Sequence, residues 1–272
     1  MLCLEANGHY AWSIRVIHDW IEWSRAKPKK GALIATCRLI ANADRGNQVL
    51  DLLSHVRRSC ADADEEQSIN DKNYFRDVYA QAIGSLHKNG DFACADELYC
   101  TAVEEGILPW AVVEPATPKH TNVDAENCVS PLTLDLHGMS ASVAKSAVRV
   151  ALQRELFRMP SWLNSSATED DTKSEQREII IVTGRGAHST DRFQPILRPQ
   201  VQQMLTEEFY PLLSSSSLKG NMGALLIPAE DVNAWLLYHK QQRGVQMLAL
   251  ANIIRNISFG ARLVRSLRRL AT

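Results

Sequence analysis

The sequence predicts an α-helical N-terminal region, then a small α/β domain, and finally a basic amphipathic helix, which is an α + α/β fold class. Three observations lead to this prediction. Residues 1–113 show helical periodicity interrupted by turn residues, residues 131–243 alternate short apolar strands with helices, and residues 244–272 hold five basic and no acidic residues. Residues 114–130 are rich in proline and polar residues without periodicity, so we expect a linker there.

The composition fits a folded protein of one or two domains. Of the 272 residues, 45% are hydrophobic and 22% are charged, which excludes disorder of the whole chain. The longest apolar runs, such as Ile179–Val182, are far too short to span a membrane. The six cysteines form no C-x-x-C pair, so we expect reduced thiols rather than a zinc site or a disulfide scaffold. Residues 1–20, which include Glu5 and Asp19, resemble neither a secretory signal nor a transit peptide.

The formal net charge of -1 hides an uneven distribution along the chain. Residues 1–125 carry 13 Lys and Arg against 18 Asp and Glu, whereas residues 244–272 carry five against none. A general polyanion-binding protein would be more basic than this chain. Only the C-terminal segment has the sign of charge that nucleic acid or an anionic membrane favours.

Turn residues divide the N-terminal region into helices. In the first helix, apolar residues recur at three- and four-residue steps, and Lys27–Gly31 ends it. We expect its tryptophans, Trp12, Trp20 and Trp23, to pack into the core rather than to form a stacking surface. Later helices are expected at about Ala32–Ala43, around Val49–Val56, at Tyr74–His87 and at Phe92–Glu105, separated by turns at Asp44–Asn47 and Asn89–Asp91 and by a polar loop at Ala61–Asn70.

Strand and helix patterns alternate in the second half of the chain. The Ile-rich strand Glu178–Val182 is expected to be central in the sheet because it is apolar throughout. Pro160–Arg177 is polar and is expected to be a loop. The other expected strands are Leu132–Leu136, Ala224–Ile227 and, more weakly, Leu212–Ser217, and the expected helices are Ser140–Phe157, Ile196–Phe209 and Val232–His239.

The strongest local signal is Leu134-Asp135-Leu136-His137-Gly138, which stands at a strand end immediately before a helix. Ligands of α/β sheets bind at this carboxyl edge. Asp135 and His137 are two residues apart and so share one face of a regular strand. A carboxylate beside an imidazole orients the ring and favours its charged form, which suits general acid or base chemistry. The alternative is structural, with Asp135 capping the helix and His137 packed at its start.

Thr183-Gly184-Arg185-Gly186, followed by His188, leaves the strand Glu178–Val182. Glycines let the backbone approach a ligand, and exposed N–H groups bind phosphate. Arg185 can hold a phosphate through two hydrogen bonds, and His188 can act as a second acid or base. The alternative is an ordinary glycine-rich turn with an exposed arginine. For the third motif, Gly220–Gly223 before the expected strand Ala224–Ile227, we favour a simple turn that enters the strand.

In this order, the three motifs resemble the small MutS-related (SMR) domain in its plant-type form, over roughly residues 131–243. The resemblance is carried by an LDLH-x-MS start, a TG-x-G-x-HS loop and an N-x-G…W-L ending, here Leu134–Ser140, Thr183–Ser189, and Asn221–Gly223 with Trp235 and Leu236. It implies a small α/β sandwich with a four-stranded sheet. Many members of the family nick or cleave nucleic acid.

The family's aspartate and histidine correspond to Asp135 and His137, and its TG-x-G loop to Thr183–Gly186. Asp135 would orient and charge His137, or hold a divalent metal such as Mg²⁺. His137 would move the proton of the attacking hydroxyl or water, and Arg185 with the loop amides would stabilise the phosphorane charge. The expected catalytic residues are Asp135, His137, Arg185 and His188, and the expected nucleic-acid-binding residues of the loop are Thr183, Gly184 and Gly186.

The helices upstream resemble the pentatricopeptide (PPR) repeat. One repeat is carried by Val78–Ile83, Lys88–Asp91, Ala95–Tyr99 and Glu105–Pro109, and Leu33–Val56 resembles a degenerate earlier one. The PPR–SMR combination is typical of organelle RNA proteins in photosynthetic lineages, which implies RNA more than DNA and a chloroplast or mitochondrion. The two base-reading positions of the repeat hold Ala80 and about Trp110, which are poor base readers, so a protein partner of the helices is also considered.

The C-terminal segment Val245–Leu270 alternates apolar residues with arginines, as a basic amphipathic helix does. Three interpretations remain open: packing on the domain, contact with phosphate, or attachment to an anionic membrane surface. The arginines expected to contact phosphate are Arg262, Arg265, Arg268 and Arg269. The main hypothesis is a nucleic-acid-binding protein with an SMR-type endonuclease domain, and its rival is a non-catalytic RNA- or protein-binding scaffold.

Overall fold

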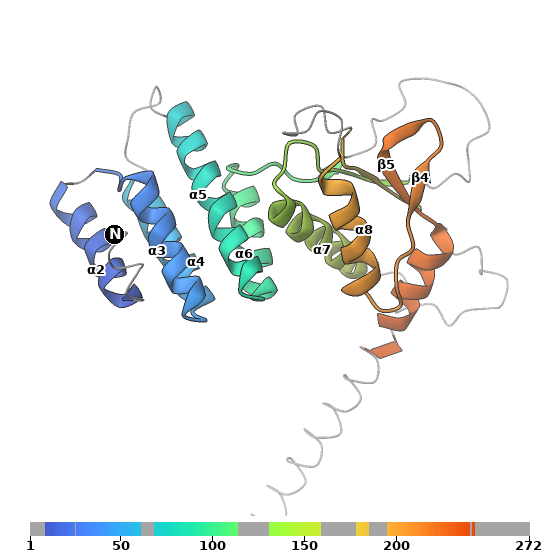
Figure 1. Ribbon diagram of the computed structural model, residues 1–272, viewed down its shortest axis with the longest axis horizontal. Coiled ribbons are helices and arrows are strands. Elements are labelled where there is room, and N and C mark those ends of the chain that lie inside the picture. The colour runs from blue at the N-terminus through green and yellow to red at the C-terminus, as the bar shows by residue number, and fades with distance from the viewer. Residues whose placement is uncertain are drawn as a thin grey trace, which may run out of the picture.

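The computed structural model describes residues 9–24, 26–60, 68–113, 131–158, 178–184, 195–239 and 241–242 of the chain. Figure 1 shows a row of helices that leads into a sheet with further helices beside it. The expected order, helices first and an α/β domain second, is therefore confirmed. The expected linker of residues 114–130 and the expected basic helix of residues 244–272 lie outside the described residues.

The N-terminal helices form antiparallel pairs that pack side by side. α3 and α4 make one hairpin and α5 and α6 a second, α3 packs on α5, and α4 packs on α6. All the expected helices are present, although α5 begins at Ser68 rather than at Tyr74. Among the described residues, no helix is both long and apolar enough to cross a membrane. The bounds are α2 Tyr10–Ser24, α3 Lys30–Asn42, α4 Gly46–Ser59, α5 Ser68–Lys88 and α6 Phe92–Glu104.

The turn between α5 and α6 has the geometry that Asn89–Asp91 predicts. Gly90 adopts a φ of +78°, which costs little without a Cβ. The Asp91 carboxylate accepts a hydrogen bond from the N–H of Cys94 at 3.2 Å and caps α6. At the start of α4, a Cβ on Gly46 would stand 2.7 Å from the Cys94 sulfur and closer still to the Asp91 carboxylate. Glycine at this position thus lets the two hairpins approach each other.

The tryptophans of α2 do not pack into the core, so that expectation is wrong. Ile17 and Ile21 are the apolar side chains of α2 that are buried. Trp12, Trp20 and Trp23 retain 60%, 44% and 91% of their exposure. Periodicity shows that a helix has a wide apolar face, but it does not show whether a neighbouring helix covers all of it.

Four of the cysteines lie in the described part of the chain, and all four are free thiols. They are Cys37, Cys60, Cys94 and Cys100. Burial raises the pKa of the Cys37 thiol to about 12, so it stays protonated and inert. These cysteines are packing residues of the helical core.

In the described residues, the α/β domain is built on a mixed sheet of five strands in the order β1-β2-β3-β5-β4. β2 and β3 are parallel, and every other neighbouring pair is antiparallel. The expected four-stranded sheet is thus wrong by one strand, because β1 pairs with Thr133 and Leu134 at the edge. Two residues are too few to show an alternating pattern. The strands are β1 Val112–Val113, β2 Leu132–Asp135, β3 Ile179–Val182, β4 Ser216–Leu218 and β5 Asn221–Ile227.

Alternation along the parallel strands decides which side chains enter the core. Leu132 and Leu134 of β2 and Ile179 and Ile181 of β3 are buried. β3 lies between β2 and β5, so its expected central position is confirmed. In chain order, α7 (Ala141–Arg158) follows β2, α8 (Leu197–Glu207) precedes β4, and residues 229–239 form a further helix after β5.

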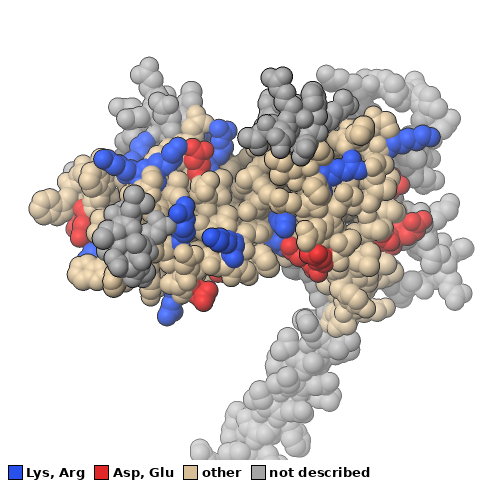
Figure 2. Space-filling model, in the orientation of Figure 1, with Lys and Arg blue, Asp and Glu red and all other residues tan. Residues whose placement is uncertain are grey.

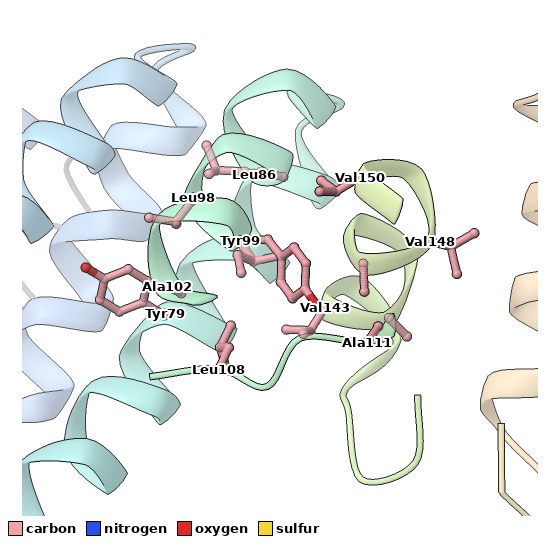
Figure 3. Close-up of a cluster of buried hydrophobic side chains, with 14 of the residues drawn as sticks. Tyr79, Leu86, Leu98, Tyr99, Ala102, Leu108, Ala111, Val143, Val148 and Val150 are labelled. Carbon is pink, nitrogen blue, oxygen red and sulfur yellow. The ribbon is translucent and has the colours of Figure 1, made fainter. Parts of the chain in front are cut away.

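The helical hairpins and the α/β domain share one hydrophobic core. α7 packs against both α5 and α6. Figure 3 shows Leu86 of α5 and Tyr99 of α6 facing the apolar side of α7, which includes Val143 and Val150. All four side chains are buried. The α5–α6 hairpin is therefore held rigidly against the α/β domain by apolar packing.

Arg149 of α7 ties this junction together. It is 8% exposed, and its guanidinium donates two hydrogen bonds to Asp96 of α6, at 2.7 and 2.8 Å. It also donates to Glu208 at 2.8 Å and to Nε2 of His87 at 2.9 Å. The ring of Phe92 lies 4.9 Å from the guanidinium carbon. A buried cation with two carboxylates and a cation–π contact is well compensated.

The stability of this junction is expected to depend on pH through His87. Burial, Arg149 and Lys145 lower the pKa of His87 from 6.5 to about 4. The unfolded chain therefore binds more protons than the folded protein between these values, and stability falls as the pH is lowered from about 6.5 toward 4. His87→Gln retains an acceptor for Arg149 and is expected to flatten this fall, measured as urea unfolding at pH 7 and pH 5. An unchanged pH dependence would contradict the assignment.

Candidate functional site

The motifs after β2 and β3 leave the sheet at the same edge. The parallel register pairs Asp135 with Val182, and the N–H of Leu136 donates to the Val182 carbonyl at 2.8 Å. Because parallel strands end at the same edge, the residues after Asp135 and after Val182 emerge side by side. The sheet thus brings together two of the three motifs that the sequence singles out.

Asp135 and His137 form a hydrogen-bonded pair at this edge. Oδ1 of Asp135 lies 2.7 Å from Nδ1 of His137 and also accepts from the His137 backbone N–H at 3.1 Å. The carboxylate is an acceptor, so the proton lies on Nδ1 and the Nε2 of a neutral ring keeps its lone pair. The His137 side chain is 74% exposed and that of Asp135 34%. Within the described residues, Nε2 has no hydrogen-bond partner, which leaves it accessible to a ligand.

Two glycines shape the backbone around this pair. Gly138 has a φ of +75° and Gly184 a φ of +79°, a region that other residues rarely adopt. A Cβ on Gly184 would lie 3.7 Å from the Cβ of His137. Gly184 therefore lies beside the histidine.

The third motif anchors the glycine loop through one carbonyl group. The Gly223 carbonyl accepts hydrogen bonds from the N–H of Thr183 at 2.8 Å, the N–H of Gly184 at 3.1 Å and the Thr183 hydroxyl at 3.1 Å. The N–H of Gly223 in turn donates to Oδ1 of Asn221 at 3.0 Å. Asn221–Gly223 are the first residues of β5 rather than a turn, so the strand begins three residues earlier than the expected Ala224, and the turn lies at Lys219 and Gly220. The Gly223 carbonyl also fixes Thr183 and Gly184 beside His137.

This anchoring bears on two residues expected to bind nucleic acid. Thr183 is 6% exposed, and its hydroxyl is used within the fold. The N–H of Gly184, expected to stabilise an anion, instead donates a hydrogen bond to the Gly223 carbonyl. Both residues therefore position the loop. The other expected site residues, Arg185, Gly186, His188, Arg262, Arg265, Arg268 and Arg269, lie outside the described residues.

Arg198, which the sequence does not single out, braces the same edge from α8. Its guanidinium donates to the Met222 carbonyl at 2.7 Å and to the Ser217 hydroxyl. These contacts fix the β4–β5 hairpin, and so the Gly223 carbonyl, relative to the start of α8. No sequence pattern signals them, because they join residues 19 and 24 positions apart in different elements.

The donor set at this edge is small. In the part of the chain that the structure describes, no group of three or more His, Cys, Asp and Glu side chains is placed to hold a metal ion. Asp135 offers one carboxylate, of which Oδ1 is used by His137. Mg²⁺ is commonly held by one or two carboxylates together with water and substrate phosphate, so Asp135 fits the role of a single protein ligand.

Comparison with known families agrees with this arrangement. Residues 134–228 match the Smr domain; the match begins within β2, runs through β5 and includes all three motifs. No curated protein matches the sequence significantly. The chain therefore contains a Smr domain, which is a nucleic-acid-binding, nuclease-related domain.

Gly184→Ala tests the close approach of the loop to His137. The substitution places a side chain at a φ of +79° and against the His137 Cβ. The added Cβ would make only an ordinary contact with His137, so the effect comes from the left-handed φ. We expect a stability loss of about 1 kcal/mol and a larger relative loss of nucleic-acid cleavage, because backbone strain at Gly184 shifts the peptide that leaves β3 beside His137. Gly220→Ala, at a φ of +82° in the β4–β5 turn with open space around it, is the matched control and should affect stability alone.

Proposed function

We propose that this protein is an endonuclease that cleaves nucleic acid, preferably RNA, at the edge formed by Asp135, His137 and the glycine loop. The observation that carries the proposal is the 2.7 Å contact between Asp135 and Nδ1 of His137, with Nε2 exposed. This geometry fixes the tautomer that accepts a proton at Nε2. It lies within the segment that matches a nuclease-related domain.

In the proposed reaction, Nε2 of His137 takes the proton of the attacking hydroxyl or water. The attacking oxygen forms a bond to phosphorus, and the bond to the leaving oxygen breaks. The leaving oxygen takes a proton from His188 or from water. Asp135 stabilises the imidazolium formed during attack. Arg185 and the amides that follow Gly184 in the loop stabilise the added negative charge on the phosphate.

A divalent ion fits this scheme in one role. When bound, Mg²⁺ supplies positive charge to a phosphate oxygen, and Asp135 is the carboxylate that would hold it. Asp135 keeps its contact with His137 through Oδ1, which leaves Oδ2 for such a ligand. The orientation of His137 does not depend on the metal.

The helices supply a basic surface even though residues 1–125 are acidic overall. Figure 2 shows Lys and Arg side chains along the upper edge of the helical region. Lys27 lies 5.9 Å from the ring of Tyr74, and Arg57, whose charge is shared with Glu105 at 3.8 Å, lies 5.0 Å from the ring of Phe75, so both basic groups lie beside the N-terminal half of α5. Phosphate binds favourably to such a cluster. This surface supports a nucleic acid as the partner of the helices.

We propose that α3–α6 are PPR-type hairpins that do not read base sequence. Trp110, at one expected reading position, stacks on Tyr99 with ring centroids 6.3 Å apart. The guanidinium of Arg154 lies 4.4 Å above the same indole. Trp110 is thus a packing residue of the junction with α7. Binding by the helices is then expected to depend on phosphate charge rather than on sequence.

The rival function is a non-catalytic binding scaffold, and one experiment separates the two. The full chain is incubated with labelled single-stranded RNA, duplex RNA and supercoiled DNA, with magnesium and with a chelator. Cleavage of one substrate supports the endonuclease and identifies its polymer and its metal requirement. Binding that weakens steeply with salt, without cleavage of any substrate, refutes catalysis and supports the scaffold.

A further inference from the structure

The outer face of α2 is an exposed apolar stripe. Trp12, Val16, Trp20 and Trp23 follow one another at three- and four-residue steps, so they lie on one side of the helix. They are 60%, 43%, 44% and 91% exposed, in that order. The opposite side, with Ile17 and Ile21, is buried where α2 packs on α3 and α4. We call these four residues the tryptophan stripe.

The tryptophan stripe lies at one end of the molecule, and the Smr sheet lies at the other (Figure 1). Each of the helices α3 to α6 packs between neighbours on more than one side. Helical hairpin arrays bury each apolar face against the next element. Within the described residues, no helix or strand covers the tryptophan stripe. The opposite face of α2, in contrast, is covered by α3.

The charges beside the stripe indicate what kind of partner fits. One flank of the stripe carries Arg15, Asp19 and Glu22, so it has both signs of charge and a net negative balance. Arg15 adjoins the stripe, with its guanidinium 6.0 Å from the Trp12 ring. Nucleic acids and anionic membranes favour a basic surface instead. A protein surface with the same mixture of charges is the better match.

We propose that the tryptophan stripe binds a second copy of this chain, with the two α2 helices packed antiparallel. A two-fold axis near the middle of the stripe sets Trp12 opposite Trp23 of the other copy and Val16 opposite Trp20. The same axis places Arg15 between Asp19 and Glu22 of the other copy, within roughly 2 Å along the helix axis at 1.5 Å per residue. Such a pairing matches apolar with apolar residues and basic with acidic ones.

The exposed area is sufficient for the centre of such an interface. The three indole rings together expose on the order of 400–500 Å² per copy, given the size of a tryptophan side chain. A standard interface buries about 800 Å² per partner, with an apolar centre and a polar rim. The charged flank of α2 supplies part of that rim. Trp23, the most exposed of the rings, is the expected anchor residue.

The pairing has a consequence for the geometry of the Smr domains. Because the Smr sheet lies at the opposite end of the molecule from α2, the two Smr sites of the dimer lie at its two far ends (Figure 1). Two linked sites bind one long nucleic acid more tightly than a single site does, through effective concentration.

The first test is the mass of the full chain in solution by sedimentation at several concentrations. The wild type is expected to form a dimer, and Trp23→Glu is expected to raise the dimer dissociation constant at least tenfold. Tyr210→Ser, a change of an exposed aromatic residue in the Smr domain, is the control and should remain dimeric. A wild-type chain that stays monomeric at every concentration overturns the proposal, as does a Trp23→Glu variant that dimerises like the wild type.

A charge exchange tests the antiparallel register and uses only exposed residues. Arg15→Glu alone and the double variant Asp19→Arg/Glu22→Arg alone are each expected to weaken the dimer, because like charges face each other. An equimolar mixture of the two is expected to restore a dimer of wild-type affinity that contains one copy of each. Two variants that dimerise as well as the wild type, or a mixture that stays as weak as its components, overturn this register.

Discussion

His137→Ala is expected to lower the rate of nucleic-acid cleavage by roughly 10²–10⁴-fold, the usual contribution of a positioned acid or base. The ring is 74% exposed and held by Asp135 at 2.7 Å, so its removal takes away the proton acceptor without opening the core. Stability and nucleic-acid binding are expected to stay close to those of the wild type. The measurements are single-turnover cleavage of labelled substrate, urea unfolding and binding under the same salt conditions.

Two further variants show whether His137 acts by its chemistry. Asp135→Asn keeps an acceptor for the His137 backbone but removes the charge that stabilises an imidazolium, so we expect at least a tenfold loss of rate. His18→Ala, on α2, is the matched control and should cleave like the wild type. Wild-type rates in both His137→Ala and Asp135→Asn would refute the proposed mechanism.

The largest loss of stability is expected for Arg149→Ala. The change removes the guanidinium of a side chain that is 10% exposed and leaves Asp96, whose side chain is 12% exposed, without its partner. Removing one member of a buried ion pair leaves the other charge unpaired and lowers the free energy of unfolding by about 3–5 kcal/mol. Glu208 and Phe92 lose their contacts with the same group. The measurement is the free energy of unfolding of the full chain in urea.

The control for Arg149 is a neighbouring arginine of the same helix. Arg154 is 42% exposed, and its ion pair with Glu104, itself 71% exposed, spans 3.8 Å. Exposed pairs of this kind contribute about 0–1 kcal/mol, and the contact of the Arg154 guanidinium with the Trp110 ring at 4.4 Å adds about 0.5–1 kcal/mol. The loss for Arg154→Ala should therefore be smaller than the loss for Arg149→Ala. Equal losses for the two variants would show that the junction does not depend on the buried network.

Features with a local signal could be predicted from the sequence. The helices follow from apolar periodicity, and the α5–α6 turn follows from Asn89–Asp91. The proximity of Asp135 and His137 is predicted from a shared strand face, but β2 ends at Asp135, and the pair is close because the chain turns there and the carboxylate accepts from the His137 N–H. In each case the residues that interact are close in the chain.

Features that depend on distant residues could not be predicted. The N–H and the hydroxyl of Thr183 both donate to the Gly223 carbonyl, 40 residues away, and a backbone carbonyl has no signal in the sequence. Arg149 and Asp96 are 53 residues apart and belong to helices assigned to different regions. The exposure of Trp23 depends on which element lies beside α2, and an apolar periodicity does not contain that information.

The central claim is that nucleic acid binds where the three motifs meet, beside His137. The most direct measurement is the nuclear magnetic resonance signal of the His137 ring, assigned by its loss in His137→Ala, during addition of a short non-cleavable single-stranded oligonucleotide. We predict that the ring signal of His137 and the backbone amide signals next to Gly184 shift together and saturate together. Shifts confined to the helices, with an unchanged His137 signal at saturation, would contradict the claim.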